Sequence, residues 1–532
     1  MIDVQLQDLL VLGICAIAHL AYRHRRKKLL PLPPGIPGWP LLGNALDMPL
    51  QYVHVFYKDL GKRLGTKIIH MEALGMHVIV LNDIEMAQDL LEKRSALYSS
   101  RSVSGFTVLD VHGLLHLTER SAKVSSLFST MPYGVNWRHH RRMFEQYFSD
   151  NSLPRVQEMQ IEFLRKCLLV NLYSHPDQFE EHVKNCVGGV STSMTYGFTV
   201  QRQDDPVVHY FEKAIVDATA AAAPGNFLVN IIPQLKYIPE WMPGAHFKKT
   251  GRELRKRLLE AMDVPYQKSL DSMNAGTARE SFVSATLERH RDQSDFEGKA
   301  VCAKETAGDV FGAASETTVA STMTFILAML KYPDVQRMGQ QELDSVVGPD
   351  RLPDFSDLSC LPYLSAIVKE VLRWNPIAPA GVPHLTTDED TYNGYYIPKN
   401  CMIIANTYAM LHDEEIFQNP TNFDPSRFTN IDGTIRNDLP NPEKIATFGF
   451  GRRICPGRDI ALSMLHIVAA SILHLFDIAP AYDNEGNPVD VEPKFYAESL
   501  VSNPLPFKCK ITPRAGRDVE SLLQEYVGTD PI

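Results

Sequence analysis

The ten residues FGFGRRICPG, which run from Phe448 to Gly457, constrain this chain more than any other segment. They hold a single cysteine, Cys455, among glycines that would let a flat group approach the backbone closely. An apolar run of helical length, Ile460–Phe476, follows. Cys455 is therefore predicted to lie just before a helix N-terminus, where free N–H groups and the helix dipole favour a metal-binding thiolate. The alternative is a buried structural cysteine, which behaves as a small hydrophobe.

The order of five residues in this segment resembles the heme-binding signature of the cytochrome P450 superfamily, the heme-thiolate monooxygenases. These residues are Phe448, Gly451, Arg453, Cys455 and Gly457. The resemblance implies heme b with Cys455 as axial thiolate, and Phe448, Gly451 and Arg453 as further cofactor-binding residues. A thiolate on heme iron pushes electron density toward O–O cleavage. The resemblance covers about residues 30–515 and is strongest to fungal, especially basidiomycete, members of secondary metabolism.

Composition excludes several other classes of protein. The 532 residues contain no Ser/Gly linker and no repeat of fixed period, which favours one large helix-rich unit. The net charge of −10 argues against nucleic acid as a partner. The eight cysteines are scattered and none forms a CxxC pair, which indicates a reducing compartment rather than a disulfide framework or a zinc site.

The N-terminus is typical of a membrane anchor. Leu9–Tyr22 is apolar except for His19, and the basic run Arg23–Lys28 follows it directly. A cleaved signal peptide would carry its positive charge before the apolar run. We therefore expect an uncleaved signal anchor with its C-terminal side in the cytosol, although fourteen residues is short for a span of about 20.

Three regions are expected from this pattern. Residues 1–28 form the anchor and its basic flank, residues 29–44 a proline-rich hinge, and residues 45–532 the catalytic domain. The resemblance implies a single-pass protein of the endoplasmic reticulum membrane with a cytosolic body.

The expected fold is mainly α with a small β region, the cytochrome P450 fold preceded by the anchor helix. Ile68–Leu81 reads as a hairpin turning at Leu74-Gly75, helical patterns dominate from about residue 83 to 375, and residues 394–507 mix short strands with one long helix. The stretch Ser102–Trp137 is longer than expected, and residues 113–123 within it are either a lid insertion or an error in the gene model.

A long helix is predicted over Ala300–Leu330, because the segment lacks proline and Pro333 stops it. Its middle contains Glu316 and Thr317, and a carboxylate inside an apolar helix is costly unless it is used or paired. A solvated glutamate with a packed threonine is the alternative. The resemblance implies that both are catalytic and relay protons to dioxygen. Ala314 stands where the family more often has glycine.

A second helix, Leu361–Trp374, carries Glu370 and Arg373, and Arg427 follows later in the chain. Such i,i+3 pairs are common on helices and by themselves say little. The resemblance implies that these three residues form a buried cluster with a structural role.

Heme propionates require fixed cations and donors. The resemblance assigns this role to Trp137 and Arg141, spaced i,i+4 in NWRHHRR, to His384 and to Arg453. A solvated basic helix face is the alternative for the first pair. The further cations Arg138, Arg142, Lys444 and Arg452 are expected on the surface near the cysteine.

No dinucleotide fingerprint follows a strand, so electrons must come from a partner. The resemblance implies membrane-bound NADPH–cytochrome P450 reductase, with O2 and an apolar, compact substrate, a terpenoid or an aromatic secondary metabolite. Two alternatives remain: a heme-thiolate isomerase or dehydratase that uses no O2, against which Glu316-Thr317 argues, and a non-catalytic heme-binding protein, against which the full set of motifs argues.

Overall fold

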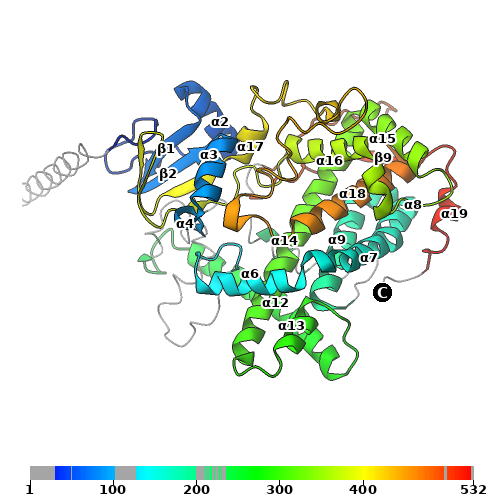
Figure 1. Cartoon of the computed structure of the whole chain (residues 1–532), viewed down its shortest axis with the longest axis horizontal. Coiled ribbons are helices and arrows are strands. Elements are labelled where there is room, and N and C mark those ends of the chain that lie inside the picture. The colour runs from blue at the N-terminus through cyan, green and yellow to red at the C-terminus, as the bar shows by residue number, and fades with distance from the viewer. Residues whose placement is uncertain are drawn as a thin grey trace, which may run out of the picture.

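A computed structural model describes residues 30–49, 51–101, 127–198, 237–496 and 500–528, with scattered residues between 210 and 235. The expected anchor, residues 1–28, and the stretch 113–123 lie outside the described residues. The described part is mainly helical, as expected. Its main sheet lies on one side of the helical body, whereas a two-stranded sheet near the C-terminus lies on the other side (Figure 1). The helices are α2 (Val53–Leu64), α3 (Ile84–Gln88), α4 (Ser95–Tyr98), α6 (Val135–Tyr147), α7 (Leu153–Phe163), α8 (Val170–Ser174), α9 (Phe179–Tyr196), α12 (Phe247–Asn274), α13 (Phe282–His290), α14 (Phe296–Lys331), α15 (Pro333–Val346), α16 (Pro362–Trp374), α17 (Thr407–Leu411), α18 (Arg458–Leu475) and α19 (Val519–Leu523).

The predicted hairpin is present. Strands β1 (Ile68–Ala73) and β2 (Met76–Leu81) pair antiparallel, with Ile68 opposite Leu81. The turn residues Leu74 and Gly75 have φ angles of 52° and 84°, the backbone that a tight two-residue hairpin turn requires. This hairpin forms one side of the main sheet.

The main sheet brings distant segments together in the order β1-β2-β7-β4-β3. Strand β7 (Met402–Ala405) runs parallel to β2, and the short strands β4 (His384–Leu385) and β3 (Ser100–Arg101) complete the far side. In the pairing of β3 with β4, Arg101 stands opposite His384. Two further two-stranded sheets consist of β5 (Asp390–Tyr392) with β6 (Tyr395–Ile397), and β8 (Phe476–Pro480) with β9 (Cys509–Pro513).

Helix α14 is the predicted long helix and is 36 residues long. Pro333 does stop it, since Pro333 is the first residue of the next helix, α15, where its missing N–H costs nothing. The C-terminal half of α14 is buried almost all round and packs with α9, α16 and α18. In the described part of the chain, α14 and α18 are apolar and long enough to cross a bilayer. Most of each is buried in the protein, so both serve as core helices.

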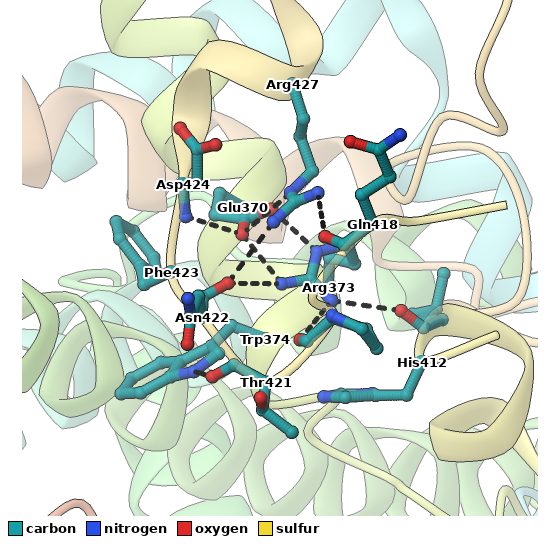
Figure 2. Close-up of polar contacts among 12 residues, drawn as sticks. Glu370, Arg373, Trp374, His412, Gln418, Thr421, Asn422, Phe423, Asp424 and Arg427 are labelled. Carbon is teal, nitrogen blue, oxygen red and sulfur yellow. Dashed lines mark hydrogen bonds and ion pairs between the residues drawn. The ribbon is translucent and has the colours of Figure 1, made fainter. Parts of the chain in front are cut away.

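The predicted Glu370–Arg373–Arg427 cluster is also present (Figure 2). Arg373 donates from Nε and Nη2 to the two carboxylate oxygens of Glu370, each at 2.7 Å, and Arg427 Nε donates to the same carboxylate at 3.1 Å. The remaining donors of Arg373 reach backbone carbonyls of Leu411, Pro420 and Asn422. Because both charges are fully buried and fully hydrogen-bonded, the cluster ties α16 to the segment that leads toward Cys455.

Candidate active site

The candidate site is a cavity of about 330 Å³ between α14, α6 and the segment around Cys455. Most of its lining is apolar, including Phe144, Met194, Val310 and Ile377. Seven of the nine sequence-predicted site residues line it: Trp137, Arg141, Thr317, His384, Phe448, Arg453 and Cys455. Gly451 does not line the cavity but shapes the loop behind it. Glu316, one position before Thr317, is half-buried and does not line the cavity.

The loop that carries Cys455 is held in a fixed shape by its own backbone. The N–H of Cys455 donates to the carbonyl of Phe448 at 2.8 Å. Gly449 and Gly451 have φ angles of 79° and 54°, and a Cβ on Gly451 would collide with the carbonyl oxygen of Leu91. This position therefore requires glycine, and the close approach that the sequence predicted is made to the protein backbone.

Cys455 stands three residues before the first residue of α18, as predicted, and its thiol opens onto the cavity. Burial raises the pKa of the Cys455 thiol, and this effect outweighs the backbone N–H of Gly457 and the positive charges of Arg141 and Arg458. The backbone N–H of Gly457 favours the thiolate, as expected just before α18, but in the metal-free protein burial has the larger effect. A bound metal must displace the proton.

Helix α6 places Trp137 and Arg141 against this loop. Arg141 donates to the carbonyl of Ile454 at 2.7 Å and to Glu145 at 2.6 Å. The guanidinium of Arg453 lies 4.5 Å from the ring centre of the buried Trp137, a cation–π contact. The alternative of a solvated basic face thus fails for Trp137 and Arg141, although Arg138 and Arg142 on the same helix are exposed.

Two buried guanidinium groups at this end of the cavity have no carboxylate partner among the described residues. Arg453 donates to the carbonyls of Ser99, Phe128 and Met131, and Arg101 donates to that of Val382. Burial lowers the pKa of each arginine to about 9. The positive charge of Arg453 adds to this effect at Arg101, and that of Arg141 adds to it at Arg453. Buried charges are normally paired, so this pattern calls for an anionic ligand.

Sequence reasoning missed Arg101. It reaches the site because β3 pairs with β4, a contact between residues almost 300 positions apart. No local motif marks it.

His384 differs from these arginines. Its Nδ1 lies 2.7 Å from the carbonyl oxygen of Tyr98, which can only accept, so Nδ1 carries the hydrogen. Burial, with the nearby charge of Arg101, lowers the pKa of His384 well below its usual value. A neutral ring presents Nε2 as an acceptor, so His384 can donate to a carboxylate only after it gains a proton.

The opposite wall is one face of α14. Ala313, Ala314, Thr317 and Thr318 line the cavity there. Thr317 Oγ1 donates to the carbonyl of Ala313 at 2.7 Å, within the helix. Its hydroxyl oxygen can accept a further hydrogen bond from a molecule in the cavity. The methyl group of Ala314 packs among apolar neighbours and contributes to this wall.

Comparison with known proteins decides the family. The family model for cytochrome P450 matches residues 33–511. The chain belongs to the cytochrome P450 family. A cytochrome P450 monooxygenase of Armillaria gallica is 39% identical over 94% of this chain and 95% of its own length. The cytochrome P450 monooxygenase ple1 of Rhodocybe pseudopiperita is 37% identical, over 97% and 96%. Tryptamine 4-monooxygenase of Psilocybe cyanescens is 36% identical, over 96% and 98%.

Membership makes this P450 an oxidoreductase of the heme-thiolate monooxygenase class, which uses heme b with an axial cysteine thiolate, O2, an organic substrate and a redox partner. The residues of the cavity fit that cofactor. Heme b carries two propionates, and the cavity presents two buried guanidinium groups, Arg101 and Arg453, that have no carboxylate partner within the described ranges. Cys455 supplies a thiol on the same cavity wall.

Proposed function

We propose that this P450 inserts one oxygen atom from O2 into an unactivated C–H bond of a compact, largely apolar secondary metabolite, a terpenoid or an aromatic molecule. The observation that carries the proposal is the cavity itself, because Cys455 and Thr317 line one apolar space. Tryptamine, the substrate in the name of one relative, is aromatic, which supports the aromatic option.

Cys455 is the proposed axial ligand. When bound, heme with a thiolate ligand supplies one-electron chemistry and favours O–O cleavage. Phe448 and Gly451 hold the loop in shape, through the bond from Cys455 N–H to the Phe448 carbonyl and through the close contact of Gly451 with Leu91. Arg141 and Arg453, which contact the loop and the indole of Trp137, would hold the propionates together with Arg101 and a protonated His384.

Thr317 and Glu316 are proposed to manage protons. Thr317 would hold a water molecule in the cavity through its hydroxyl oxygen. Glu316 does not line the cavity, so it would act from the neighbouring face of α14 as the link toward solvent. Proton delivery by positioned groups contributes roughly 10²–10⁴ in rate.

Electrons are proposed to come from NADPH through membrane-bound NADPH–cytochrome P450 reductase. Four cations near the cysteine loop and on α6 are exposed and available to an acidic partner: Arg138, Arg142, Lys444 and Arg452. Complementary charge of this kind speeds and orients docking. The proposed location is the endoplasmic reticulum membrane, with residues 1–28 as a single-pass anchor, residues 29–44 as a hinge and residues 45–532 as the cytosolic catalytic domain.

The test combines the holoenzyme with the reductase, NADPH and a panel of terpenoid and aromatic candidates under ¹⁸O2. We expect substrate-dependent NADPH oxidation that requires O2, and a product heavier by one ¹⁸O atom. Product formation that proceeds equally well without O2 would contradict the proposal and favour an isomerase or dehydratase. Heme binding without turnover of any candidate, and without uncoupled NADPH oxidation, would favour the non-catalytic alternative.

A further inference from the structure

Asp309 is the only acidic residue among the described residues that line the cavity. It lies on α14 and is only 5% exposed. Its carboxylate oxygens accept hydrogen bonds from the N–H and the Oγ of Ser129, at 2.8 and 2.9 Å. None of the described lysines or arginines forms an ion pair with it. A carboxylate of this kind is costly to keep inside an apolar cavity.

One nearby charge that acts on Asp309 is already paired with another carboxylate. Among the described titratable groups, only His140 favours the ionised form of Asp309 electrostatically. The imidazole of His140, however, lies 2.9 Å from the carboxylate of Glu305. Burial therefore dominates and raises the pKa of Asp309 to about 6. Above that pH Asp309 is a buried carboxylate that forms no ion pair with a described residue.

The contact with Ser129 does not explain the charge. Hydrogen bonds from Ser129 need acceptor atoms, and a neutral side chain offers them without the cost of a buried ion. The Ser129 segment is also held independently, because Arg453 donates to the carbonyls of its neighbours Phe128 and Met131. Each oxygen of Asp309 keeps a further lone pair for a ligand in the cavity.

Asp309, Ala313 and Thr317 follow one another at i, i+4 and i+8, so they form one stripe along α14, and all three line the cavity. Eight residues of helix correspond to about 12 Å. A ligand held at Asp309 would thus lie along the small side chains of Ala313 and Ala314, with its far end near Thr317.

We propose that Asp309 is a specificity-determining residue that binds a positively charged nitrogen on an otherwise apolar substrate. The cavity is then divided by charge: buried arginines receive the carboxylates of the cofactor, and the buried aspartate receives the cation of the substrate. This inference rests on the proposed function. It narrows the substrate class to apolar molecules that carry a protonated or quaternary nitrogen, about 12 Å or less from the end of the molecule that lies near Thr317.

The test uses two probes that differ in one atom. Trimethyl(4-phenylbutyl)ammonium and (5,5-dimethylhexyl)benzene have the same shape, but a charged nitrogen in the first replaces a carbon in the second. A quaternary ammonium has no lone pair and cannot ligate iron. The affinities of both probes for the holoenzyme are measured at pH 8 by equilibrium dialysis. The quantity compared between variants is the affinity for the ammonium divided by the affinity for the neutral probe.

The parent enzyme is expected to bind the ammonium at least as tightly as its neutral counterpart, whereas an apolar cavity without a usable carboxylate would reject the cation. Asp309→Asn should lower the ratio by about 10-fold or more by removing a charge-assisted contact, while the neutral probe keeps its affinity. Ser129→Ala, which removes one hydrogen bond to the carboxylate but not its charge, should preserve the ratio, as should Asp309→Glu.

Two results would overturn the inference: weaker binding of the ammonium than of the neutral probe to the parent enzyme, or an equal loss of both probes in Asp309→Asn. The first measurement needs no variant and stands even if Asp309→Asn does not fold. Neither depends on turnover. Failure of the proposed monooxygenase function would appear in the ¹⁸O experiment, so the two failures are distinguishable.

Discussion

At the scale of single residues, Thr317 tests the proton-handling role of α14. Thr317→Ala should leave heme content and substrate binding intact but divert reducing equivalents to hydrogen peroxide, because the proposed water would lose its partner. The ratio of product formed to NADPH oxidised should fall, with peroxide rising in step. Removal of a proton-transfer group costs roughly 10²–10⁴ in the rate of the step it serves.

Thr306→Ala is the matched control for this substitution. Thr306 is on the same helix and makes the same kind of hydrogen bond, from Oγ1 to the carbonyl of Cys302 at 2.8 Å, but it does not line the cavity. Its coupling ratio should match that of the parent enzyme. Full coupling in Thr317→Ala would mean that protons arrive by another route, such as a hydroxyl of the substrate.

Replacement of Arg101 should affect the heme-free protein and the holoenzyme differently: it should not destabilise the first, but it should weaken heme binding in the second. In the heme-free protein its buried charge has no carboxylate partner in the part of the chain that the structure describes, so Arg101→Met should leave the free energy of unfolding unchanged or raise it by about 1–3 kcal/mol. In the holoenzyme the same change removes a proposed propionate contact, and heme affinity should fall roughly 10- to 100-fold. Unfolding of the heme-free protein and heme transfer to an acceptor protein measure the two effects.

The exposed Arg142 on α6 provides the control. Arg142→Met should change neither the free energy of unfolding of the heme-free protein nor the free energy of heme binding by more than about 0.5 kcal/mol. If Arg101→Met destabilises the heme-free protein strongly and leaves heme affinity unchanged, Arg101 is a structural residue.

At the scale of secondary-structure elements, the buried cluster of Glu370, Arg373 and Arg427 holds the end of α16 to the segment before the cysteine loop (Figure 2). Arg373→Met removes both hydrogen bonds to Glu370 and the three to backbone carbonyls. The carboxylate of Glu370 then stays buried with Arg427 as its only charged partner among the described residues. Loss of one partner of a buried pair typically costs about 3–5 kcal/mol. We expect a matching fall in the free energy of unfolding, and poor heme incorporation.

Arg337→Met is the matched comparison, because Arg337 and Asp334 form an i,i+3 pair on α15 that is exposed to solvent. An exposed pair of this kind contributes at most about 1 kcal/mol. Similar stability losses in the two variants would show that burial does not set the strength of the Glu370 cluster.

Elements with local signals could be predicted from the residues themselves. Contacts across the fold were predicted only where the family resemblance implied them, as for the Glu370–Arg373–Arg427 cluster. Proline fixed the boundary between α14 and α15, and Leu74-Gly75 marked the hairpin turn. Neither Arg101 nor the Asp309–Ser129 contact has a local signal, because each depends on segments far apart in the chain. The effect of burial on the pKa of the Cys455 thiol had no signal in the sequence, because burial depends on the assembled fold.

At the scale of the whole molecule, the N-terminal segment carries a prediction about location. The apolar run Leu9–Tyr22 and the basic run Arg23–Lys28 imply an anchor with the body in the cytosol. Protease added to sealed microsomes should digest the catalytic domain, and deletion of residues 1–28 should release it into the soluble fraction. Full protection of the body in intact microsomes would reverse the proposed orientation.

The whole molecule also explains how one cavity serves both cofactor and substrate. The β3–β4 pair and the cysteine loop supply Arg101 and Arg453 at one end, while α14 supplies Asp309 and Thr317 along the other wall. Charges of opposite sign are thus kept on different elements of one apolar space. Ligation of the iron by Cys455 is the central claim, since the roles of the surrounding residues depend on it.

The absorption spectrum of the reduced protein under carbon monoxide tests that claim most directly. The parent enzyme should show the red-shifted Soret band expected of a thiolate-ligated heme, and Cys455→His should lose this band while still binding heme. The exposed Cys360 provides the control, because Cys360→Ser should keep the band. A Cys455→His variant that retains the band would show that another group ligates the iron, and would contradict the account.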